Sequence, residues 1–78
     1  MPAVAAKKID CVGLYCPVPI LRTRDALRRL AVGELLEVTA DDPAAPADMR
    51  SFAARTGHAL VEFEAHGPVF RFVVRKTR

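Results

Sequence analysis

Two prolines, at positions 17 and 19, constrain the fold of this chain more than any other feature of its sequence. Proline has no backbone N–H and a fixed φ, so it is disfavoured inside a helix and inside a central strand. It is tolerated in the first turn of a helix, where N–H groups have no intrahelical partner. The run Cys16-Pro17-Val18-Pro19 therefore predicts the start of a helix.

The hydrophobic pattern changes its period at these prolines. Residues 8–12 alternate as a short strand, which places Ile9 and Cys11 on one side of the pleat. Residues 19–31 instead carry apolar side chains at helical spacing, and Gly33 is expected to end this helix. The predicted apolar stripe consists of Ile20, Leu27, Leu30 and Ala31.

The rest of the chain predicts one more strand, one more helix and a hairpin. Residues 34–40 read as a strand, residues 41–46 as a loop, and the following helix should end at Gly57. Residues 60–64 and 69–74 alternate on either side of a turn at His66-Gly67-Pro68. The order β-α-β-α-β-β predicts an α/β (α+β) fold, a two-layer sandwich with two helices on one face of a four-stranded mixed sheet. A chain of 78 residues is a single domain, 1–78, with a core of about 8–76.

Composition excludes several classes of protein. The chain is 51% hydrophobic and 27% charged, which is too apolar for disorder, and no apolar run is long enough for a membrane span. Lys7 and Lys8 follow a short apolar stretch instead of preceding one, so a secretory signal is not expected. Two cysteines cannot form the framework of a disulfide-rich secreted domain. We therefore expect a cytoplasmic protein with reduced thiols.

The net charge of +3 indicates an affinity for anions without naming a partner. Basic residues gather on the first predicted helix and at the C-terminus. A solvated basic face or a dock for an acidic protein surface explains them. Direct nucleic-acid binding is not expected, because no aromatic residues are interleaved with them. These basic residues are Arg22, Arg24, Arg28 and Arg29 on the helix, and Arg71, Arg75, Lys76 and Arg78 near the end.

Cys16 is the candidate catalytic residue. A free cysteine is most often a small buried hydrophobic residue, and Cys11, on a predicted strand, fits that description. Cys16 follows a Gly-Leu-Tyr turn and precedes Pro17, which places it beside a helix N-terminus. The helix dipole there is expected to lower the thiol pKa, and Arg22 and Arg24 are expected to add positive field. A persulfide, whose outer sulfur is also an anionic nucleophile, would suit the same position.

Other chemistries fit the sequence less well. Four residues separate the two cysteines, whereas a thioredoxin-like pair needs two. His58 and His66 lack ligand spacing for zinc, and His66 in a turn is a poor general base. Asp41, Asp42 and Asp48 read as loop and helix caps rather than as a metal site. We therefore expect no metal and no cofactor.

The residues from Asp10 to Pro19 resemble the signature of the TusA-like (SirA-like) sulfur-carrier family. The likeness continues through Gly33-Glu34, the segment Asp41-Asp42-Pro43 and the closing hairpin, and it covers about residues 8–76. The resemblance implies that Cys16 accepts a sulfane sulfur from a cysteine desulfurase or rhodanese-like donor. The persulfide then passes to an acceptor protein, in tRNA thiolation, molybdenum-cofactor maturation or sulfur oxidation.

The resemblance also assigns roles around Cys16. Gly13, Leu14, Pro17 and Pro19 carry over as positioning residues, and Arg24 as a helix arginine beside the site. The family often has Arg at the position of Tyr15, and its tRNA-thiolation members tend to have an acidic residue at that of Val18. These two positions flank the thiol and could contact partners. The alternatives are a regulatory or interaction module without sulfur chemistry and a weak RNA-binding protein, both of which should tolerate Cys16→Ser.

Overall fold

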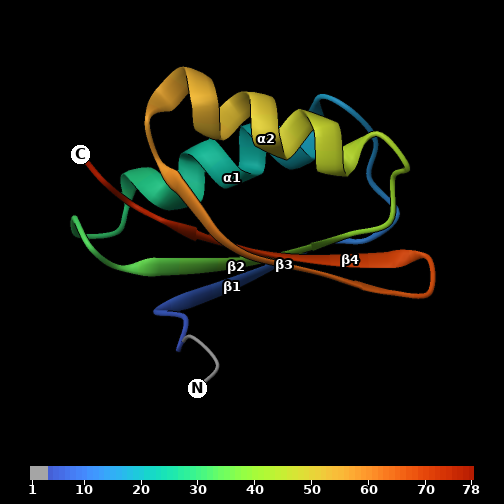
Figure 1. Cartoon of the computed structure of the whole chain (residues 1–78), viewed down its shortest axis with the longest axis horizontal. Helices are drawn as coiled ribbons and strands as arrows, with labels where there is room; N and C mark the ends of the chain where they lie inside the picture. The colour runs from blue at the N-terminus through green and yellow to red at the C-terminus, as the bar shows by residue number, and fades with distance from the viewer. Residues whose placement is uncertain (1–3) are drawn as a thin grey trace.

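The computed structural model describes residues 4–78 as two helices packed on one face of a four-stranded sheet (Figure 1). The strands lie side by side in the order β1-β2-β4-β3. β1 and β2 run parallel, and the other neighbours run antiparallel. The predicted order and the predicted mixed two-layer sandwich are confirmed. The elements are β1 (Lys7–Cys11), α1 (Val18–Arg28), β2 (Leu35–Ala40), α2 (Ala45–Thr56), β3 (Ala59–His66) and β4 (Val69–Arg75).

The core lies between the sheet and the helices, and strand alternation builds it. Leu36, Val38 and Ala40 occupy every second position of β2 and are fully buried. Their cross-strand partners include Phe72 and Val74 on β4, which are also fully buried. The helices contribute Leu27 from α1 and both Met49 and Phe52 from α2 to the same cluster. Phe52 and Phe72 are the two aromatic residues among the buried members of this cluster.

The first helix is shorter than the sequence predicts. It ends at Arg28, and Ala31, predicted to be in the apolar stripe, lies beyond it and is exposed. The prediction that Gly33 ends the helix is also wrong. Gly33 has a φ of +93° in the turn into β2, where its N–H donates to the Lys76 carbonyl at 2.7 Å.

The buried side of α1 includes a polar residue that the hydrophobic pattern could not reveal. Thr23 is fully buried, and its hydroxyl donates to the Pro19 carbonyl at 2.8 Å, so the polar atom is satisfied inside the helix. Ala26 and Leu27 complete this face, with Ile20 and Leu30 packed partly buried against the core.

The second helix and the hairpin follow the prediction more closely. α2 ends at Gly57, whose φ of +83° is the left-handed conformation that terminates helices. His66, predicted in the turn, is instead the last residue of β3 and pairs with Val69. Gly67 and Pro68 alone make the turn.

The open face of the sheet, away from the helices, carries an ion-pair network centred on Arg71. Its guanidinium contacts Glu37 at 2.7 Å, Glu64 at 3.1 Å and Glu62 at 3.3 Å. Arg71 is therefore neutralised by its neighbours, and it does not belong to a free basic surface at the C-terminus.

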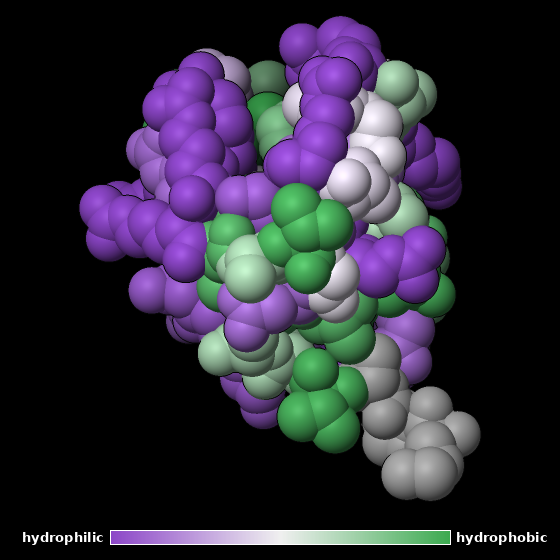
Figure 2. Space-filling view, turned by 90° about the vertical axis from the view of Figure 1, so that its left-hand side faces the viewer, coloured by the Kyte–Doolittle hydropathy of each residue, from purple (hydrophilic) through white to green (hydrophobic). Residues whose placement is uncertain are grey.

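The two ends of the sandwich differ. At the end where β1 begins, Val4 and Val32 are exposed, and Figure 2 shows hydrophobic surface there among hydrophilic side chains. At the other end, β1 and β2 finish and both helices begin (Figure 1). Neither helix of residues 4–78 is long and apolar enough to cross a membrane.

Replacing Cys11 with Ala should destabilise the fold, because Cys11 is fully buried in the core cluster. We expect a loss on the order of 1 kcal/mol in the free energy of unfolding, measured by urea denaturation. The neighbouring Val12 is 43% exposed, so Val12→Ala is the matched control and should change stability by less. Equal losses for the two variants would contradict the assignment of Cys11 to the core.

Candidate functional site: the Cys16 loop

Two loops meet at the end of the sheet where β1 and β2 finish. Because these strands are parallel, the residues that follow each of them lie at the same edge of the sheet. Asp41 accepts a hydrogen bond from the Gly13 N–H at 2.9 Å. Asp42 accepts one from the Cys16 N–H at 3.0 Å through one carboxylate oxygen, and one from the Ala44 N–H at 3.1 Å through the other. The loop after β2 thus fixes the backbone of the loop that carries Cys16.

The Cys16 loop is also ordered from within. Gly13 has a φ of +86°, which turns the chain directly after β1. Leu14 packs partly buried against the core, and its N–H donates to the Cys11 carbonyl at 3.1 Å. The Tyr15 carbonyl accepts the Val18 N–H at 2.8 Å, which closes the turn around Cys16.

The two prolines lie where the sequence predicts a helix start. Pro17 is the N-cap residue of α1, and Pro19 is buried in its first turn. The peptide bond between Cys16 and Pro17 is cis. The lack of an N–H group at Pro17 and Pro19 costs the helix no hydrogen bond, because an N–H at these positions has no acceptor within the helix.

The two thiols are free and have different surroundings. Cys11 is fully buried, and burial raises the pKa of its thiol while the positive charge of Arg22 acts in the opposite direction. Cys16 is exposed at the rim of the sandwich. Of the two sulfur atoms, only that of Cys16 is presented to another molecule.

The pKa of Cys16 is raised, not lowered as the helix-start argument predicts. A hydrogen bond to the Asp48 carboxylate raises the pKa of the Cys16 thiol, and partial desolvation and the charges of Asp48 and Asp42 add to the effect. Asp48 lies in the first turn of α2, and this helix begins beside the Cys16 loop. Both carboxylates favour the neutral thiol over the thiolate.

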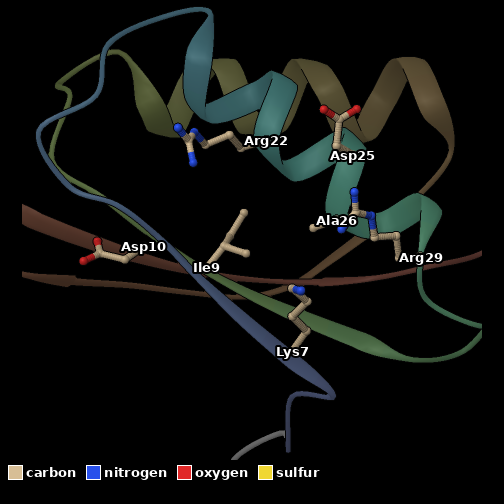
Figure 3. Close-up of a pocket in the computed structure, with 7 residues that line it drawn as sticks. All are labelled: Lys7, Ile9, Asp10, Arg22, Asp25, Ala26 and Arg29. Carbon is tan, nitrogen blue, oxygen red and sulfur yellow. The ribbon is translucent and has the colours of Figure 1, made fainter.

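The two arginines predicted to support the thiol act elsewhere. Arg24 forms an ion pair with Asp25 at 3.5 Å. Arg22 lines a pocket between α1 and β1 (Figure 3). Neither arginine is among the groups that shift the pKa of Cys16.

The surface around Cys16 is apolar. Tyr15 is 69% exposed, and Val12, Val18 and Leu21 are each about two-fifths exposed. All four residues lie within five positions of Cys16 in sequence, and exposed hydrophobic side chains are a feature of contact surfaces. Cys16 therefore lies in an apolar rim, with carboxylates on its α2 side.

Sequence reasoning treated Asp41, Asp42 and Asp48 only as caps. That reading is right for Asp42, which caps the turn at Ala44, but it misses the contacts to the Cys16 loop. The adjacent pair Asp41-Asp42 at the end of a strand parallel to β1 was the available signal. Within residues 4–78, no group of His, Cys, Asp and Glu side chains could hold a metal ion.

Replacing Asp48 with Asn should lower the pKa of the Cys16 thiol, because the charge that favours the neutral form is removed. At neutral pH the variant should therefore be alkylated by iodoacetamide faster than the wild type, with the difference vanishing at high pH. Asp25→Asn is the matched control, since Asp25 pairs with Arg24 and Arg28. An unchanged or slower reaction of the Asp48 variant would contradict the assigned contact.

Comparisons with known proteins agree on one family. The model of the family described as "Sulfurtransferase TusA" matches residues 7–76. The sulfur carrier protein TusA of Allochromatium vinosum is 38% identical over 91% of this chain and 93% of its own length. A protein of Archaeoglobus fulgidus, whose name as a sulfur carrier is provisional, is 49% identical over 88% of this chain and 91% of its own length.

The crystal structure of the SirA-like protein from Desulfitobacterium hafniense has the same fold. Its TM-score to this chain is 0.79 at 24% identity, and the match covers 92% of this chain and 99% of the other. The family match and the structural match thus each cover most of this chain. The chain belongs to the TusA sulfurtransferase family.

Proposed function

We propose that this protein is a sulfur carrier that accepts a sulfane sulfur on Cys16 as a persulfide and relays it to an acceptor protein. The observation that carries the proposal is the contrast between the two cysteines. Cys16 is exposed on a loop fixed by Asp42 and two prolines, whereas Cys11 is buried. The relatives named as sulfur carriers support the same role.

The proposed transfer needs no oxidant and no cofactor. The Cys16 sulfur attacks the outer sulfur of a donor persulfide, so a new S–S bond forms as the donor S–S bond breaks. The donor cysteine leaves as a thiolate, and the proton released from Cys16 balances its charge. A nucleophile of the acceptor then attacks the outer sulfur on Cys16, so a bond from this sulfur to the acceptor forms as the Cys16 S–S bond breaks. Cys16 leaves as a thiolate and takes up a proton.

In the proposed mechanism, the Cys16 thiol is activated by the encounter with a partner. The isolated thiol is mostly protonated at neutral pH, because the Asp48 contact raises its pKa above the ordinary cysteine value. Only the thiolate attacks sulfur efficiently. A docked donor that brings positive charge to the two carboxylates and releases the thiol from Asp48 would lower this pKa.

The proposed donors are a cysteine desulfurase or a rhodanese-like enzyme. The apolar rim of Val12, Tyr15, Val18 and Leu21 is the surface on which such a partner would pack. We place the carrier in the cytoplasm, where tRNA 2-thiouridine synthesis, molybdenum-cofactor maturation and sulfur oxidation are the routes that it could serve. Tyr15 and Val18 flank the Cys16-Pro17 pair and are the positions expected to select among acceptors.

Incubation with a cysteine desulfurase, cysteine and pyridoxal phosphate should add the mass of one sulfur atom to the chain, as measured by intact mass spectrometry. Cys16→Ser should abolish the addition, and the matched variant Cys11→Ala should retain it, since Cys11 is buried. Treatment with a reductant should remove the added mass, because a persulfide is reducible. Equal loading of the Cys16→Ser variant would refute the proposed function and favour a binding module without sulfur chemistry.

A further inference from the structure

The outer edge of β1 is an unpaired strand edge. β1 is the first strand in the sheet order and, within residues 4–78, pairs only with β2. The opposite edge, β3, is interrupted by an irregularity between Leu60 and Glu62, a device that discourages further pairing. The ladder of β1 is regular over its five residues. Its outward backbone groups are therefore available to another extended chain.

A pocket of about 580 Å³ lies over this edge, between β1 and α1 (Figure 3). Ile9 on the strand and Ala26 on the helix supply its apolar part. Charged side chains surround them. The lining consists of Lys7, Ile9, Asp10, Arg22, Asp25, Ala26 and Arg29.

The positive charges of this pocket are not neutralised. Within residues 4–78, Lys7, Arg22 and Arg29 form no ion pair. The Asp25 carboxylate is shared by Arg24 and Arg28, outside the pocket lining. In Figure 3 this carboxylate points away from β1, whereas the Lys7 side chain points toward α1.

Asp10, the other acidic residue of the lining, is also engaged. One of its carboxylate oxygens accepts the Val12 N–H at 2.9 Å and the Thr39 hydroxyl at 3.1 Å. Three cations without partners thus face a strand edge, and the two nearby carboxylates are occupied. The pocket is complementary to negative charge.

We propose that the free edge of β1 and the pocket above it bind an extended acidic segment of a partner protein, added to the sheet as a fifth strand. Main-chain hydrogen bonds to β1 would supply affinity, as in other cases of strand addition. Alternate side chains of the segment would face the helix layer, with carboxylates near the three cations and aliphatic groups on Ile9 and Ala26. Lysines on an edge strand repel basic segments, so the edge selects by charge.

Other occupants fit less well. Arg22 lies on α1 and Arg29 is the residue that caps its C-terminus, seven positions later, which separates them by roughly 10 Å along the helix axis, too far for one small anion. The lining contains no aromatic side chain on which a nucleotide base could stack. A second copy that used its own β1 edge would bring two cationic edges together, and one that used its β3 edge would present Glu62 and Glu64, which already bind Arg71.

This site is independent of sulfur chemistry, although it adjoins the Cys16 loop. β1 ends at Cys11, and the loop that carries Cys16 begins directly after it. Arg22, at one end of the pocket, lies close enough to Cys11 to affect its pKa. A partner bound along β1 would be held beside the exposed thiol by contacts outside the rim.

The test uses the full chain and a synthetic peptide in which glutamate and valine alternate over the length of β1. Titration followed by amide NMR should shift resonances of β1 and of the α1 face that carries Arg22 and Arg29. The matched peptide with lysine in place of glutamate should not bind. A glutamate peptide whose alternate amide nitrogens are methylated should bind at least tenfold more weakly, because it cannot complete the strand pairing.

Charge-reversal variants of the protein provide a second test of the proposal. Arg29→Glu should weaken binding of the glutamate peptide on the order of tenfold, and raising the salt concentration should weaken wild-type binding. Arg55→Glu makes the same charge change in the last turn of α2 and should leave binding unchanged. Circular dichroism of each variant establishes that it is folded.

Three outcomes would overturn the proposal. They are shifts that map away from β1, equal binding of the methylated peptide, and equal effects of the Arg29 and Arg55 variants. Concentration-dependent dimers that the glutamate peptide does not dissociate would assign the edge to a second copy instead. None of these results bears on sulfur loading of Cys16, so this proposal and the carrier function can fail separately.

Discussion

The Asp42 carboxylate is the contact on which the arrangement of the site depends. It is only 9% exposed, and a carboxylate with so little contact with water must be stabilised by hydrogen bonds. The backbone N–H groups of Cys16 and Ala44 provide them. One side chain therefore sets where the Cys16 loop lies and where the second helix begins. The position of the thiol relative to Asp48 follows from that shared anchor.

The parallel pairing of β1 and β2 makes this contact possible, because it brings the two loops to one edge of the sheet. The same pairing leaves the other side of β1 without a neighbouring strand among residues 4–78. The fold thus separates two surfaces. One is apolar and surrounds a thiol at the end of the strand, and the other is cationic and runs along its side.

Local sequence patterns correctly predicted the structural features that depend on residues close together in the chain. Strand parity placed Cys11 in the core, and the conformational freedom of glycine placed the end of α2 at Gly57. The end of α1 was missed because Leu30 and Ala31 continue the apolar spacing after the helical hydrogen bonds stop at Arg28. The pKa of Cys16 was missed because it depends on Asp48, which lies 32 residues away and reaches the thiol only through tertiary packing.

The contact between Cys16 and Asp48 also affects how readily oxidants attack the thiol. Peroxides oxidise thiolates far faster than thiols, and the first product, a sulfenic acid, leads on to irreversible acids. Because the Asp48 contact raises the pKa of Cys16, the exposed sulfur is held in the less vulnerable form. For the proposed carrier, the Asp48 contact therefore slows oxidation of an exposed cysteine without burying it.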